Sequence, residues 1–234
     1  MRGAGEAVAE TLWPTRCAVC DRPGELICAQ CRAHLRYIEW WRACPRCGAP
    51  MGRVQCCECN SVMMQALERD EPSFDAMASV VEYDEAAARI VRAWKDAGER
   101  RLGRELALMM ARAIPAEWLI GAPVATPVPA TKAALRRRGF DHTAELAREV
   151  ARLLGITYAE TLARPATHDQ RALGRKGRAR NLNGSFQAAA RARVAPYLLL
   201  IDDVCTTGAT VNAAADALRE AGAQTIRCLT FARV

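Results

Sequence analysis

Eight cysteines near the amino end have the spacing of metal ligands. They form four pairs in which two residues separate the thiols, namely Cys17 and Cys20, Cys28 and Cys31, Cys44 and Cys47, and Cys56 and Cys59. The short spacer lets both sulfurs of a pair face one ion, and two pairs complete a tetrahedron around zinc at about 2.3 Å. Eight thiolates therefore predict two Zn²⁺ ions. A four-sulfur site keeps no position for a catalytic water, so we expect both ions to be structural or to support partner binding.

The spacing alone leaves open which pairs share an ion. We favour neighbouring pairs, with Cys17, Cys20, Cys28 and Cys31 on one ion and Cys44, Cys47, Cys56 and Cys59 on the other. Crossed pairing is the alternative, and reactive or disulfide-forming cysteines are the alternative to zinc. Cys57 fits the spacing poorly and is interpreted as a spare thiol. Because the segment has few large apolar side chains, metal would have to hold it together.

A second constellation lies near the carboxyl end, where residues 198–211 read LLLIDDVCTTGATV. The apolar run predicts a buried strand that delivers Asp202 and Asp203 to its carboxyl end, where open α/β sheets bind their ligands. The threonine loop follows, made of Thr206, Thr207, Gly208, Ala209 and Thr210. Its backbone amides and hydroxyls, at the start of a helix, suit a phosphate monoester. Carboxylates beside such a cradle predict a ligand with adjacent hydroxyls and a phosphate, which describes a ribose 5-phosphate.

Two other interpretations of this motif are possible. Two acids after a strand also occur in ATPases, but the chain has no GxxxxGK[ST] loop to accompany them. An ordinary strand-to-helix turn with solvated acids is the second. The motif resembles that of type I phosphoribosyltransferases, which bind phosphoribosyl pyrophosphate (PRPP). That resemblance implies that Asp202 and Asp203 hold the ribose hydroxyls, that the threonine loop holds the 5-phosphate, and that PRPP itself chelates most of the Mg²⁺.

Over about residues 17 to 233 the chain resembles the ComF family of competence-associated proteins, which join a double zinc ribbon to such a domain. The matching positions are Tyr83 to Gly98 with Lys95, Val128, Pro129, Arg138 to Phe140, Leu162 to Arg164, Gln170, Leu173, Arg178, Asn181 and Phe186. The resemblance implies a zinc-ribbon module over 15–62 and a phosphoribosyltransferase-like domain over 75–234. It also implies a role in DNA uptake or single-stranded DNA handling, with competence proteins as partners. Where the family has RGFNQ, Asp141 and His142 replace the last two residues.

Whether the chain transfers phosphoribose is left open by these patterns, because no residue pattern identifies an acceptor. A PRPP-binding protein without transferase activity and an active salvage enzyme both fit. If transfer occurs, Asp202, Asp203 and Arg138 are the expected catalytic residues. Arg138 ends a run of three arginines in the stretch that corresponds to the family's mobile loop, where cations could neutralise the departing pyrophosphate.

The basic character of the chain belongs to one segment. Residues 130–193 hold 14 Lys and Arg against 5 Asp and Glu, whereas the whole chain has a net charge of +7. The run from Arg164 to Arg180 is too long for one pyrophosphate. It fits a solvated loop, and it equally fits a groove for single-stranded nucleic acid that uses Arg175, Lys176 and Arg178.

The elements that must position these residues can be read from hydrophobic periodicity. Strands are expected over 77–83, 119–128, 156–162, 197–201 and 225–231, and helices around 87–94, 102–110, 142–154 and 211–221. This alternation predicts a parallel sheet flanked by helices, with the small zinc-ribbon module before it. We expect Trp94, Trp118 and Cys205 to be packing residues, and His142 and His168 to be either surface residues or acid–base groups.

Composition excludes two classes of protein. With 51% hydrophobic and 25% charged residues among 234, and no apolar run of about eighteen residues, neither a disordered chain nor membrane insertion is expected. The first residues lack the pattern of a secretory signal. We therefore expect a cytoplasmic protein, in which eleven cysteines favour metal sites or reduced thiols over structural disulfides.

Overall fold

Four parallel strands form the central sheet of the computed structural model, which describes residues 14–163, 186–190 and 193–234. The strands are β1 (Ala76–Glu82), β2 (Val124–Pro127), β3 (Tyr197–Cys205) and β4 (Thr225–Arg233), in the order β1-β4-β3-β2. β3 carries the apolar run Leu198–Ile201, and β4 is buried from Cys228 to Arg233, because a parallel sheet is buried on both faces. The parallel sheet expected from the sequence is confirmed.

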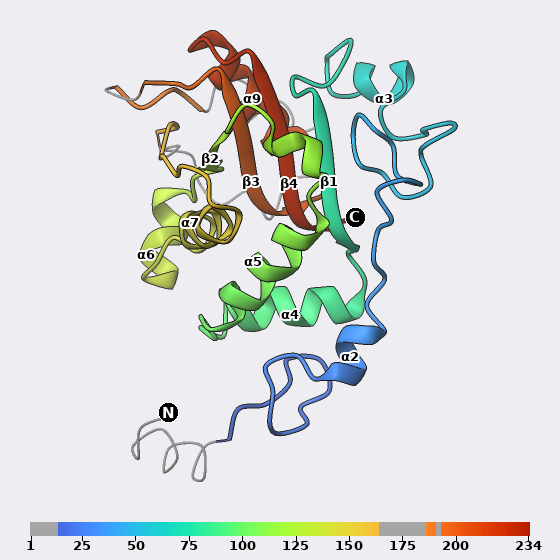
Figure 1. Cartoon of the computed structure of the whole chain (residues 1–234), viewed down its shortest axis with the longest axis vertical. Coiled ribbons are helices and arrows are strands. Elements are labelled where there is room, and N and C mark those ends of the chain that lie inside the picture. Colours follow the sequence, from blue (N-terminus) through green and yellow to red (C-terminus); the bar gives the residue numbers. More distant parts are fainter. Residues whose placement is uncertain (1–13, 164–185, 191–192) are drawn as a thin grey trace.

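Helices cover both faces of the sheet (Figure 1). α5 (Leu102–Ala113) and α7 (His142–Leu154) share one apolar core with residues of β3 and β4 such as Leu199 and Phe231. α9 (Ala209–Glu220) shares a second core with Leu198 and Leu200 of β3. Since neighbouring residues of one strand enter different cores, the fold has three layers.

α4 (Glu85–Lys95) runs across the carboxyl ends of the strands and is drawn below them in Figure 1. Asp84 caps its first turn by accepting a hydrogen bond from the Ala87 N–H at 2.9 Å. Its apolar side packs into the core, with Trp94 only 1% exposed. Trp118 is 8% exposed, so both tryptophans are core residues, as expected. The direction of α4 brings its last residue, Lys95, to the sheet edge where ligands bind in such folds.

Two expected strands differ from the structure. The strand expected over 119–128 begins only at Val124, because a 3₁₀ helix, η1 (Ala116–Leu119), and a turn precede it. The segment 156–162 forms no regular strand. It follows the edge of β2 through a single bridge between Tyr158 and Ala125, since β2 is too short to pair with more of it.

The stretch with three arginines is a helix and not an open loop. α6 (Lys132–Arg138) is capped by Thr131, whose hydroxyl accepts a hydrogen bond from the Ala134 N–H. The sequence KAALRRR consists of strong helix formers, which explains the difference. α7 begins and ends where the sequence predicted, with Asp141 as its amino-terminal cap and Gly155 just beyond its end.

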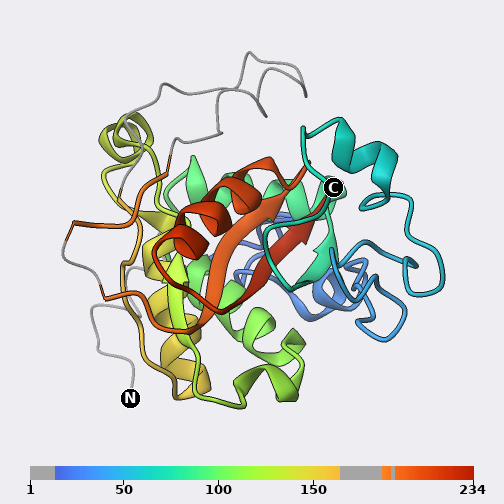
Figure 2. The same ribbon diagram turned by 90° about the horizontal axis from the view of Figure 1, so that it is seen from above.

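The cysteine-rich part holds two loop-rich lobes and the short helices α2 (Ala29–Ala33) and α3 (Ser61–Gln65). In both views residues 40–70, drawn blue to cyan, lie beside β1 at one edge of the sheet (Figures 1 and 2). There Tyr37 and Val81 form an antiparallel bridge.

The division between 15–62 and 75–234 stays a prediction. The residues between these two ranges contain the second half of α3, and Met64 and Leu67 pack there against Ala209 of α9. Among the described residues, no helix combines the length and apolarity needed to cross a membrane.

Candidate functional site

β3 ends in two buried carboxylates. Asp202 is 9% exposed and Asp203 is 4% exposed. One oxygen of Asp202 accepts the Asp203 N–H at 2.9 Å, and one oxygen of Asp203 accepts the Val204 N–H at 2.8 Å. These backbone hydrogen bonds fix the orientation of both side chains. The second oxygen of each carboxylate is left for other partners.

The threonine loop leads directly from β3 into α9. Gly208 precedes the helix with φ +77°, a left-handed conformation that favours glycine. A Cβ atom there would also lie 3.4 Å from the side-chain nitrogen of Asn212. That nitrogen donates to the carbonyl of Gly208 at 2.9 Å, which closes the turn. The loop thus sits at the amino end of a twelve-residue helix, where the helix dipole favours an anion.

Three elements meet at Asp203. Lys95, from the end of α4, forms an ion pair with its Oδ2 atom. His142, at the start of α7, places Nε2 3.7 Å from the same oxygen. Together with Arg138 and Asp96, these residues make up what we call the carboxyl-end cluster. It concentrates opposite charges beside the threonine loop, at the edge of the sheet where ligands are expected.

His142 is held in one tautomer by its neighbours. The Nη1 atom of Arg138 lies 3.2 Å from Nδ1 of His142, and Trp94 packs edge-on against the ring at 5.2 Å. Arginine only donates hydrogen bonds, so Nδ1 accepts and the imidazole proton lies on Nε2, facing Asp203. Burial, with added repulsion from Lys95 and Arg138, lowers the pKa of His142 to about 2. His142 is therefore a neutral donor and not a cation.

Asp202 has the opposite perturbation. Burial raises its pKa to about 7; Lys95 opposes that change, and Asp141 adds to it. This carboxyl therefore changes protonation near neutral pH. A ligand that needs an ionised acceptor at this position would bind more weakly in acid.

The sequence identified the two acids and the threonine loop but missed part of their surroundings. Lys95 is one of the positions that match the resembled family, but the sequence assigned it no function. Its contact with Asp203 becomes apparent only from the path of α4 in the structure. His142 is 5% exposed, so it is not a surface residue. Arg138 contacts His142 and Asp96, and its assignment to pyrophosphate stays a prediction.

The cysteines fall into two groups, each made of neighbouring pairs. The first cysteine group is Cys17, Cys20, Cys28 and Cys31, and the second is Cys44, Cys47, Cys56 and Cys59. Within each group all sulfurs lie within 4.8 Å of one another, which selects the favoured pairing over the crossed one. Cys57 and His34 are exposed and belong to neither group.

The geometry of both groups fits zinc. Sulfur–sulfur distances are 3.8 Å for Cys20 and Cys28 and 3.5 Å for Cys47 and Cys56. A tetrahedral site with bonds of about 2.3 Å puts sulfurs about 3.8 Å apart. Burial alone would raise the pKa of Cys17, but backbone N–H groups, above all that of Cys28, lower it to about 6. Cys17 is thus predisposed to the thiolate form, whereas burial raises the pKa of Cys31 and of Cys59 to about 12, so a bound cation would displace their protons.

The expected nucleic-acid site lies outside the described residues. This holds for Arg175, Lys176 and Arg178, and also for Arg164, His168, Arg171 and Arg180.

Comparison with known families matches both halves of this arrangement. A double zinc ribbon domain matches residues 8–61, and a phosphoribosyl transferase domain matches residues 197–234. The chain is 27% identical to Competence protein F of Haemophilus influenzae over 88% of its own length and 90% of that protein. The resemblance to the ComF family is confirmed.

Other relatives of this ComF-like chain are similar over comparable lengths. It is 28% identical to DNA utilization protein YhgH of Salmonella typhi, over 94% of this chain and 97% of that protein. It is 26% identical to Competence protein ComFC of Bacillus subtilis, over 86% and 81%. Among solved structures, an allosteric regulatory enzyme of purine biosynthesis aligns with a TM-score of 0.38 and 23% identity. That alignment covers 55% of the ComF-like chain and 25% of the enzyme, so the chain spans about a quarter of that enzyme's length.

Proposed function

We propose that the chain binds PRPP with Mg²⁺ at the carboxyl end of β3 and acts in DNA uptake or the handling of single-stranded DNA. One observation carries the ligand. Two buried carboxylates, Asp202 and Asp203, stand directly before a threonine loop at the start of α9. Acceptors for two hydroxyls next to an anion cradle match the ribose 5-phosphate end of PRPP.

Each part of the site has a distinct task in this proposal. The amides and hydroxyls of Thr206, Thr207, Gly208, Ala209 and Thr210 receive the 5-phosphate. Asp202 and Asp203 accept the ribose hydroxyls, so the ligand competes with Lys95 for Asp203. The Nε2–H of His142 faces Asp203 and keeps that carboxylate oriented when Lys95 moves. Bound Mg²⁺ would supply charge neutralisation for the pyrophosphate.

Arg138 and Lys95 are the cations nearest to this chemistry. Charge on the pyrophosphate grows as its bond to the ribose breaks, and a cation there lowers the barrier. We assign that role to Arg138, whose side chain is 9% exposed and is oriented by Asp96. An active phosphoribosyltransferase of nucleotide salvage is the second candidate. The complete motif over residues 198–211, with both cations beside it, favours this candidate.

Two observations support a role in DNA uptake or single-stranded DNA handling. Relatives over most of the chain carry the names competence protein and DNA utilization protein. Residues 130–193 also carry the excess of positive charge, and we assign Arg175, Lys176 and Arg178 to a single-stranded nucleic acid. We assign two structural zinc ions to the cysteine groups; zinc binding requires reduced thiols, which supports a cytoplasmic location. Competence proteins are the proposed protein partners.

Calorimetry with PRPP and Mg²⁺ tests the ligand. The double variant Asp202→Ala, Asp203→Ala should lose binding, because both hydroxyl acceptors are gone. Glu85→Gln, which changes an exposed carboxylate of α4, should bind as the native protein does. Equal PRPP affinity in the double variant and the native protein would show that the site is elsewhere. Pyrophosphate release, screened over bases, nucleosides and single-stranded DNA, then separates the enzyme from the binding protein.

A further inference from the structure

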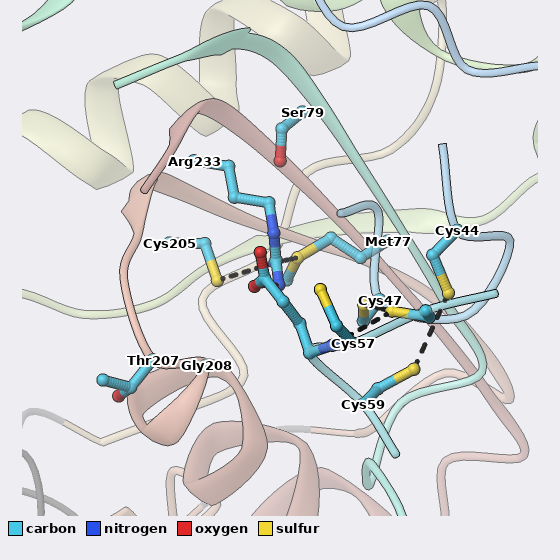
Figure 3. A network of polar contacts seen from close by, with 12 residues as sticks. Cys44, Cys47, Cys57, Cys59, Met77, Ser79, Cys205, Thr207, Gly208 and Arg233 are labelled. Carbon is cyan, nitrogen blue, oxygen red and sulfur yellow. Dashed lines mark hydrogen bonds and ion pairs between the residues drawn. The ribbon is translucent and has the colours of Figure 1, made fainter. Parts of the chain in front are cut away.

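Arg233, the last residue of β4, connects the second cysteine group to the threonine loop. Its side chain is 6% exposed. Nη2 donates to a carboxylate oxygen of Glu58 at 2.8 Å, and Nη1 lies 3.3 Å from the sulfur of Cys205. Figure 3 shows this guanidinium between Cys205 on one side and Cys47 with its neighbours on the other. A buried guanidinium without its carboxylate would be an uncompensated charge, so Glu58 holds it in place.

One end of the contact chain from Glu58 to Cys205 lies beside a predicted zinc ligand, and the other end lies beside the threonine loop. Glu58 precedes the ligand Cys59, and its backbone N–H donates to the sulfur of Cys56 at 3.4 Å. Cys205 immediately precedes Thr206, the first residue of the threonine loop. One path from the second cysteine group to the threonine loop therefore passes through Glu58 and Arg233.

The segment after the second cysteine group supports the loop a second time. Met64 and Leu67 pack against Ala209. The Ser73 N–H donates to the side-chain oxygen of Asn212 at 2.8 Å, and the side-chain nitrogen of Asn212 donates to the Gly208 carbonyl at 2.9 Å. The amino end of α9 is thus fastened to the cysteine-rich part from two directions.

The first cysteine group contacts different elements. Arg32 pairs with Glu105 of α5 at 2.7 Å, and Arg89 of α4 donates to the Val19 carbonyl at 2.8 Å. Neither contact involves a residue of the threonine loop or of α9. The lobe of the first cysteine group therefore serves as a control for the effect of the second cysteine group on the threonine loop.

We propose that Glu58 and Arg233 are positioning residues of the phosphate site, and that zinc in the second cysteine group, but not in the first, sets the geometry of the threonine loop. The inference rests on the proposed function, because it concerns the same anion site. An anion cradle made of backbone amides binds well only when it is preorganised. The loop itself is built from small side chains, so its geometry depends on what packs around it.

Two matched variants test the proposal in the full-length, zinc-loaded protein. Glu58→Gln and Glu105→Gln each remove one carboxylate of an ion pair between the cysteine-rich part and the sheet domain. Glu58 pairs with Arg233 and Glu105 pairs with Arg32, and both glutamate side chains are 32% exposed. Glu58→Gln should weaken PRPP binding about 5- to 150-fold, the usual range for coupled sites, while Glu105→Gln leaves the affinity unchanged. Hydrogen exchange of the peptide 205–212 should become faster in Glu58→Gln only, with or without PRPP.

A double variant identifies the pair as the cause. If Glu58 acts through Arg233, the combination Glu58→Gln, Arg233→Met should bind PRPP no more weakly than the more damaging single variant. Independent, additive losses would overturn the pairing.

Zinc release from the native protein needs no substitution and covers the case in which a variant does not fold. Because coupling is reciprocal, PRPP should slow the loss of one zinc to a chelator and leave the other unaffected. Equal slowing of both, or of neither, contradicts the proposal.

The two hypotheses fail differently. If the native protein binds no PRPP, the proposed function is wrong, and exchange in the peptide 205–212 still tests the positioning pair. If PRPP binds but Glu58→Gln and Glu105→Gln behave alike in affinity and exchange, the function stands and the positioning role is wrong.

Discussion

The Nη1 atom of Arg138 lies 3.2 Å from Nδ1 of His142, and this contact joins the end of α6 to the start of α7. It occurs where the chain departs from the pattern of the family that it resembles, which has glutamine in place of His142. Arg138 leaves the ring with its proton on Nε2, directed at Asp203. A glutamine amide can also donate from this position, so the substitution keeps a donor facing the acid.

We expect His142→Gln to preserve PRPP binding and His142→Leu to lower stability. Leucine offers no donor to Asp203 and no acceptor to Arg138, and an unsatisfied buried polar group costs about 1–3 kcal/mol. Urea unfolding of both variants measures the difference. A leucine variant as stable as the native protein would show that the contact contributes nothing.

Acid should destabilise the protein through His142. The pKa of His142 is lowered by burial to about 2. The unfolded chain takes up the proton near pH 6.5, so stability is lost as pH falls below that value, by roughly 2–3 kcal/mol near pH 4.5. The loss should be smaller in His142→Gln. Unfolding free energies measured from pH 7 to 4.5 check this, and parallel curves would contradict it.

PRPP binding should weaken as pH falls through about 7, because burial raises the pKa of Asp202 to about 7 and the protonated acid is a poorer acceptor. The effect of Asp202 on folding stability has the opposite dependence on pH. The folded state holds this proton more tightly than the unfolded chain, so this contribution is present below pH 4 and is lost as pH rises through 7. Calorimetry between pH 6 and 8 measures the binding. Asp202→Asn should be weaker throughout and nearly independent of pH.

Gly208→Ala should lower PRPP affinity, and Gly98→Ala should not. Both glycines have left-handed backbones, with φ +77° and +76°, so each substitution costs about 1–2 kcal/mol of stability. Only Gly208 belongs to the threonine loop. Thermal unfolding and PRPP calorimetry on both variants separate the backbone cost from the loss of the anion site, and equal affinities would remove Gly208 from that site.

Replacing Arg175, Lys176 and Arg178 by Ala should weaken binding of single-stranded DNA at every sequence and leave PRPP binding nearly unchanged. The logarithm of affinity should fall with the logarithm of salt by about 0.7 for each neutralised phosphate, and the triple variant should flatten that slope. Replacing Arg89, Arg148 and Arg152, which are exposed elsewhere, is the matched control. A loss confined to PRPP would assign the three cations to pyrophosphate.

Local signals predicted much of the fold. Asp141 and Gly155 set the limits of α7, and the apolar run before Asp202 gave β3, because caps and periodicity are properties of neighbouring residues. The segment 156–162, ITYAETL, is more polar than that run, and it forms only isolated bridges to Ala125 and Ala188.

The candidate site divides in the same way. The cysteine pairs and the threonine loop are local motifs, so the sequence could single out their residues, but the folded structure was needed to group the cysteine pairs. The contact of Lys95 with Asp203 and the contact of Arg233 with Glu58 join residues far apart in the chain. Such contacts depend on the path of α4 and on the docking of the cysteine-rich part, which no local pattern encodes.

The antiparallel bridge between Tyr37 and Val81 also decides which side of the sheet is open to other chains. β1 is an outer strand, and the Ile38 N–H donates to the Val80 carbonyl at 2.9 Å. Unpaired groups of an outer strand recruit strands from other molecules, which leads to aggregation. Because the covering segment lies between the two cysteine groups, a protein deprived of zinc would lose this protection. We therefore expect removal of zinc to expose β1 and to promote aggregation, in addition to loosening the cysteine-rich lobes.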